Sequence, residues 1–140
     1  MSELSAFFAQ NAASELTEEF VVSERFKDKE GKPIPWILRS MTEAENEEIR
    51  KTATKRVQVK KGVYTQETNP EEYVAKLVVA SVVFPNLKDA ELQKSYGVMG
   101  AEALLRKMLL PGEYASLGQK VQELNGFDQS MEDLMDEVKN

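Results

Sequence analysis

The stretch that decides the fold is NPEEYVAKLVVASVVFP, residues 69–85. An asparagine caps a helix well and Pro70 suits the first helical position, so a helix is predicted to begin here. The residues that follow are apolar on nearly every side, while Pro85 cannot continue the helix. We therefore expect residues 70–84 to form the central helix of the core, with Leu77 near its middle.

Shorter helical patterns follow this central helix. Residues 89–96, 100–110 and 113–124 each end at or just before a glycine, a proline or an Asn-Gly pair. These residues end helices or begin the next one. The sequence therefore predicts several short helices packed around residues 70–84.

A β-hairpin is predicted before the helices. Residues 19–26 and 34–39 are rich in β-branched and aromatic side chains, and a polar turn that contains Gly31 separates them. Pro33 and Pro35 cannot donate a hydrogen bond to a neighbouring strand. We therefore expect the second strand to lie at an edge or to be only half paired.

Two further segments have weaker apolar patterns. Residues 42–57 begin with capping-box spacing and run from acids to bases, which predicts a mostly solvated surface helix. Residues 58–69 are polar around Gly62 and predict a loop or a loose hairpin. At the N-terminus, residues 3–13 place Leu4, Phe7 and Phe8 on one stripe of a short helix, which must dock or fray.

The chain has 140 residues, the size of one domain. The predicted fold class is α+β: a mostly helical single domain with an N-terminal β-hairpin packed on a bundle of short helices. The expected segments are an N-terminal helical arm (1–17), the β-hairpin (18–40), a helical core (41–126) and an amphipathic C-terminal helix (127–140).

Composition excludes several kinds of catalytic site. The chain has no Cys and no His, so a Ser-His-Asp triad, a Cys-His dyad and a typical zinc site are impossible. Carboxylates gather in residues 43–48 and 132–137. They have two interpretations: a site for a metal ion or acid–base chemistry, and the solvated face of a helix. The solvated face is favoured because both clusters lie outside the apolar stripes. We predict no catalytic, cofactor-binding or metal-binding residues.

Charge is unevenly spread along the chain. The net charge is −6, with acidic ends and an excess of bases in residues 46–61. Nucleic-acid binding through this basic stretch would need aromatic side chains for base stacking, and Tyr64 is the one nearby. Residues 90–108 are a candidate helix-turn-helix, but their second helix begins without a side chain that could donate to a base edge. Protein partners or self-contact are therefore expected, rather than nucleic acid. Without a signal peptide or a membrane-length apolar run, a cytoplasmic location is expected.

The C-terminal segment is the main candidate for a partner-binding element. Its apolar residues have helical spacing, and methionine adapts to varied partners. The segment either docks on its own domain or meets a partner. The predicted partner-binding residues are Phe127, Met131, Leu134, Met135 and Val138, with Trp36 on the presumed edge strand as a further candidate.

Six stretches follow one another along nearly the whole chain: FVVSERF (20–26), DKEGKPIPWILR (28–39), MTEAEN (41–46), AKLVVA (75–80) with Pro85, LPGEY (110–114) and ELNGF (123–127). This order resembles the XkdN-like tail assembly chaperones of long-tailed phages and defective prophages. The resemblance assigns no binding role to any single residue.

The resemblance implies a non-enzymatic role. Such chaperones bind the hydrophobic tape measure protein in the host cytoplasm until the major tail protein polymerises around it, and they are typically absent from the finished virion. The expected partner is therefore the tape measure protein, with the major tail protein as a second candidate. The main alternative is a structural phage subunit, such as a head–tail connector or a tail completion protein. An enzyme is the third class.

Overall fold

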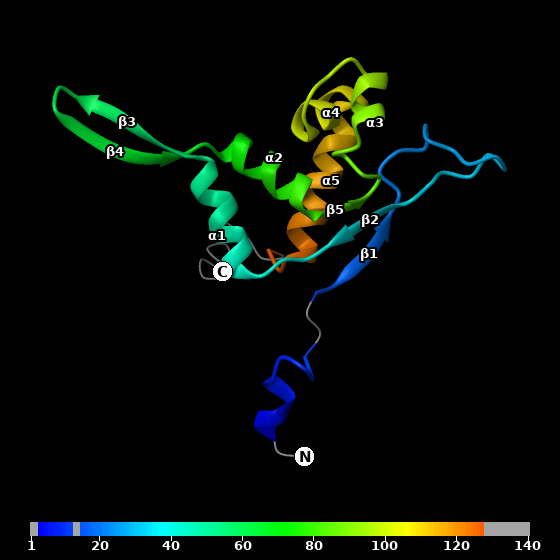
Figure 1. Cartoon of the computed structure of the whole chain (residues 1–140), viewed down its shortest axis with the longest axis horizontal. Helices are drawn as coiled ribbons and strands as arrows, with labels where there is room; N and C mark the ends of the chain where they lie inside the picture. Colours follow the sequence, from blue (N-terminus) through cyan, green and yellow to red (C-terminus); the bar gives the residue numbers. More distant parts are fainter. Residues whose placement is uncertain (1–2, 13–14, 128–140) are drawn as a thin grey trace, which may run out of the picture.

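The computed structural model describes residues 3–12 and 15–127. In these residues, five α-helices and two small antiparallel sheets form an α+β fold that is mostly helical (Figure 1). The predicted fold class is confirmed, including the N-terminal β-hairpin.

Helix α2 (Pro70–Ser81) is the centre of the core, as predicted. The Asn69 side chain accepts a hydrogen bond from the backbone N–H of Glu72 at 3.0 Å, which fixes the start of the helix. Leu77 and Val78 are each 1% exposed. The buried core cluster consists of Val22, Trp36, Leu38, Leu77, Val78, Leu87, Leu104, Leu105, Met108, Leu109, Leu117 and Val121.

Three more helices follow α2 in the chain, all three were predicted, and the last two pack against α2. They are α3 (Ala90–Ser95), α4 (Ala101–Met108) and α5 (Pro111–Leu124). Helix α5 begins two residues earlier than expected because Pro111 itself takes the first helical position. Figure 1 shows α5 running behind α2, and its Leu117 is fully buried there.

The three-stranded sheet corrects the prediction for the second hairpin strand. The strands are β1 (Thr17–Phe20), β2 (Trp36–Arg39) and β5 (Val82–Phe84), in the order β1-β2-β5. Strand β2 is therefore central, and its prediction as an edge was wrong. Both prolines lie before the strand, where they remove no hydrogen bond from it. The predicted helix 70–84 stops at Ser81, since β-branched valines favour a strand before Pro85.

The hairpin strands are also shorter than predicted. Strand β1 pairs with β2 up to Phe20 opposite Trp36. Residues 21–35 form a long connection with one isolated bridge, between Lys27 and Pro33, instead of continuing the ladder. Val22 is buried in the core, which draws the chain out of line with the strand.

A second hairpin follows helix α1 (Glu43–Thr52). Strands β3 (Thr54–Lys60) and β4 (Val63–Thr68) pair with each other and project from the domain (Figure 1). The expected surface helix is confirmed up to Thr52, but its extension to residue 57 was wrong. Alternating β-branched residues favour a strand from Thr54 onward. The hairpin interpretation of residues 58–69 is confirmed.

The N-terminal arm differs from the predicted helix over residues 3–13. The described helix η1 (Glu3–Phe7) is a single short 3-10 element. Its apolar stripe is exposed, with Phe7 80% exposed, and Figure 1 shows η1 set apart from the sheets and helices. A short isolated segment has too few hydrogen bonds to stabilise a regular α-helix, which explains the difference.

Candidate functional site

The predicted partner-binding residue Trp36 lies in the core. Its side chain is 2% exposed, and it packs with other buried residues from the sheet and helices. The reason is the central position of β2, which has a neighbouring strand on each side. The structure therefore does not present Trp36 to a partner.

Phe127 lies on the surface, at the end of α5. It is 47% exposed and lines a small concavity of about 130 Å³ together with Met41, Asn46 and Leu77. Met131, Leu134, Met135 and Val138 lie outside the described residues. The structure thus places the first residue of the predicted stripe beside the start of α1.

The end of α5 turns sharply before Phe127. Gly126 has φ +88°, a conformation that favours glycine, and the backbone N–H of Phe127 donates to the carbonyl of Gln122 at 2.8 Å. This bond pattern ends the helix and sets the direction in which the chain leaves the domain.

Asn125 anchors this exit point to two other parts of the fold. Its side-chain oxygen accepts a hydrogen bond from the backbone N–H of Met41 at 2.7 Å. Its side-chain amide donates to the carbonyl of Val121 at 2.8 Å and to the Ser81 hydroxyl at 3.4 Å. The chain therefore enters the C-terminal segment from a fixed position between α1, α2 and α5.

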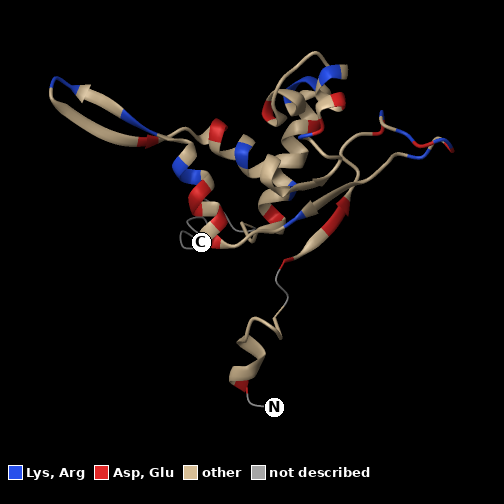
Figure 2. Ribbon diagram, in the orientation of Figure 1, with Lys and Arg blue, Asp and Glu red and all other residues tan. Residues whose placement is uncertain are grey.

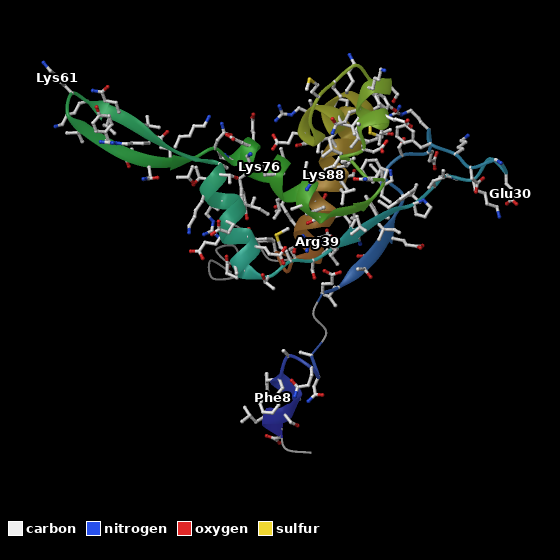
Figure 3. All side chains as sticks on the ribbon, in the orientation of Figure 1. Phe8, Glu30, Arg39, Lys61, Lys76 and Lys88 are labelled. Atoms are coloured by element: carbon white, nitrogen blue, oxygen red, sulfur yellow. The ribbon has the colours of Figure 1, made fainter. Side chains whose placement is uncertain are left out.

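Apolar side chains are also exposed away from the α5 exit. In η1 and just after it they are Leu4, Phe7 and Phe8, and Figure 3 shows Phe8 on this arm. In β5, Val83 and Phe84 are 49% and 47% exposed on an edge strand. The exposed apolar surface on β5 was not predicted from the sequence, because the β-branched residues of this strand were assigned to the central helix.

The β3–β4 hairpin carries a concentration of cations. Its fifteen residues 54–68 contain Lys55, Arg56, Lys60 and Lys61 against one carboxylate, Glu67. Figure 2 shows this basic character along the arm, and Figure 3 places Lys61 at its tip. The charge of this segment is evident from the sequence, whereas its projection from the domain is not.

Carboxylates of α1 bind cations of the protein itself. Glu45 accepts a hydrogen bond from the Arg39 guanidinium at 3.0 Å, and this bond holds the pKa of Glu45 below its usual range. Arg50 pairs with Glu43 at 3.2 Å and Lys51 with Glu48 at 3.5 Å. Within residues 3–12 and 15–127, no group of three or more acids is arranged to hold a metal ion. Glu43, Glu45 and Glu48 of this cluster therefore have cationic partners within the protein, whereas Glu47 forms no ion pair in the described residues.

Two other features bear on the rival functions. Leu104, Leu105 and Met108 of α4 are buried in the core, whereas α3 has no buried residue and packs against the core through the partly buried Leu92. None of the helices in the described part of the chain has the length and apolar character of a membrane span.

A profile described as Phage XkdN-like tail assembly chaperone protein matches residues 4–139. The chain belongs to the XkdN-like tail assembly chaperone family. This result confirms the resemblance found in the sequence.

Two proteins of Bacillus subtilis (strain 168) are similar to this chain over most of their length. YqbN is 34% identical over 137 residues, which cover 96% of this chain and 92% of YqbN. The phage-like element PBSX protein XkdN is 31% identical over 120 residues, which cover 85% of this chain and 81% of XkdN.

The crystal structure of the YqbN protein has the same fold. It matches with a TM-score of 0.78 at 29% identity, covering 91% of this chain and 99% of that one. The α+β architecture is therefore shared with a solved member of the group.

Proposed function

We propose that this chain is a non-enzymatic chaperone that binds the tape measure protein during phage tail assembly. Membership of the XkdN-like tail assembly chaperone family is the observation that carries the proposal. A tape measure protein is long and helical with apolar stripes, so its chaperone needs adaptable apolar surface and enough charge to remain dissolved. The net charge of −6 meets the second need.

We assign the contact to the C-terminal stripe that begins at Phe127. The structure supports this choice because Phe127 is half exposed at a fixed exit point, beyond which the apolar residues have helical spacing. Two of the stripe residues are methionines, whose flexible side chains adapt to different apolar partners. The major tail protein is the second candidate partner, and the host cytoplasm is the proposed location.

Co-expression tests this function. The tape measure protein encoded by the same element is expressed alone and together with the intact chain, and its soluble fraction is compared. We expect the soluble fraction to rise with the intact chain. Mass spectrometry of purified particles tests the alternative. If the soluble fraction does not rise and the chain is a stoichiometric component of the particles, a head–tail connector or a tail completion protein is supported instead.

A further inference from the structure

The end of α1 and one face of the β3–β4 hairpin form a basic surface, which we call the cationic strip: Arg50, Lys51 and Arg56. Arg50 and Lys51 line one concavity of about 280 Å³ with Glu47 of α1 and Gln66 of β4, so two cations face one carboxylate there. Gln66 is the cross-strand partner of Arg56, so both side chains lie on the same face of the hairpin. The strip therefore continues from the helix onto the hairpin.

Each cation of the strip has weak partners or none. Arg50 and Lys51 pair with Glu43 and Glu48, but the four side chains are 46–76% exposed, and pairs this exposed add little stability. The Arg56 guanidinium lies 3.9 Å from the centre of the Tyr64 ring. It has no carboxylate partner within the part of the chain that the structure describes.

The sequence supplies a matching acidic segment in residues 128–140. It contains five carboxylates against one lysine, Lys139. On a helix, one face would carry four of the acids and the opposite face the apolar stripe. The acids are Glu132, Asp133, Asp136 and Glu137, and the apolar residues are Met131, Leu134, Met135 and Val138.

The distances allow this segment to reach the strip of its own chain. Phe127 lies beside the first turn of α1, and the strip begins at the last turn of the same helix. Ten helical residues rise about 15 Å, while thirteen residues span about 20 Å as a helix and more than about 40 Å extended. The first turn of α1 carries Glu43 and Glu45, which repel the acids, so the end of the helix that carries the strip is the more favourable one.

We propose that the acidic face of residues 128–140 docks on the cationic strip of the same chain. The apolar stripe then faces outward, away from the domain. If the proposed function holds, the hairpin is a platform that presents this stripe to the tape measure protein. The contact is electrostatic and therefore weakens at high salt.

Nuclear magnetic resonance of the free, full-length chain tests the docking without any partner. Because the chain has no cysteine, the Asn140→Cys variant has a single cysteine, and a nitroxide attaches at that position alone. We expect the amide signals of Arg50, Lys51, Arg56 and Tyr64 to lose most of their intensity. High salt, Arg56→Glu or Lys51→Glu should restore them. Lys88→Glu, which makes the same change in net charge far from the strip, should not.

A second pair of variants tests which face docks. Glu132→Gln with Asp136→Asn should release the segment, whereas Met131→Ser with Met135→Ser should leave it docked. Release by the serine pair alone would mean that the stripe faces inward and would overturn the proposal.

Two outcomes of the first experiment would also overturn it. One is undiminished amide signals in the intact chain, and the other is a loss of signal intensity that charge reversal at the strip leaves unchanged. A further control mixes an isotope-enriched chain that carries no nitroxide with a chain that carries it. Loss of amide signal intensity in the isotope-enriched chain would place the contact on a second copy and would also overturn the proposal. These results are independent of tape measure binding.

Discussion

Arg25 in the long connection after β1 forms an ion pair with Glu113 in the first turn of α5, with 2.5 Å between Nη2 and Oε1. The same guanidinium donates to the carbonyl of Met108 at 2.8 Å, and the Glu113 carboxylate accepts the backbone N–H of Leu110 at 2.8 Å. This pair links the N-terminal half of the chain to the junction between α4 and α5.

The pair makes stability depend on pH. Hydrogen bonds from Arg25, Ser23 and the Leu110 backbone lower the pKa of Glu113 from 4.5 to about 2. A lowered carboxyl pKa adds stability above 4.5, and this contribution is lost as the pH falls from 4.5 toward 2. We therefore expect Glu113→Gln to lower the Tm at pH 7, with the difference from the natural chain shrinking over that interval.

The measurement is thermal unfolding of both chains between pH 2 and pH 7. Glu19→Gln serves as a control because Glu19 is exposed on β1 and has no ion pair in the described residues. A Tm difference for Glu113→Gln that stays constant down to pH 2 would show that the carboxylate charge is not responsible.

Leu77→Ala tests the position of the core. Leu77 is 1% exposed at the centre of the buried cluster, so its truncation should reduce the free energy of unfolding by about 2–5 kcal/mol. Leu4→Ala makes the same chemical change at a side chain that is 67% exposed, and should stay within about 0.5 kcal/mol. Denaturant unfolding measures both values, and similar losses for the two variants would refute the core assignment.

Divalent cations should not stabilise the chain. Three of the four α1 acids, Glu43, Glu45 and Glu48, already bind cationic side chains, the acids of the described residues form no metal cluster, and histidine and cysteine are absent from the sequence. We expect Ca²⁺, Mg²⁺ and a chelator to leave the Tm unchanged in a thermal unfolding scan. An increase of several degrees with either ion would show a bound metal.

The sequence predicted the central helices well because their signals are local. Asn69 and Pro70 mark the start of α2, and the buried positions Leu117 and Val121 follow the helical period. Where prediction failed, the outcome depends on contacts between distant residues. Val82 extends a helical apolar run but pairs with Leu38 of β2, and only that pairing turns it into a strand.

The candidate site was only partly accessible from sequence. The stripe after Phe127 could be found from its spacing, and the structure adds the fixed exit point that Asn125 creates. Trp36 was chosen because two prolines suggested an edge, and no local pattern reveals the strand on its other side. The projection of the β3–β4 hairpin likewise follows from its lack of packing against the core, which a local pattern does not report.

The most direct test of the account is the affinity of the intact chain for the tape measure protein, compared with a chain that lacks residues 127–140. Circular dichroism first establishes that the truncated chain is folded, and Met99→Ser serves as a control because Met99 is 92% exposed on the α3–α4 loop. We expect truncation to weaken binding at least about tenfold, equal to about 1.4 kcal/mol, and Met99→Ser to leave it unchanged. A folded truncated chain that binds as tightly as the intact one would contradict the assignment of the contact to the C-terminal stripe.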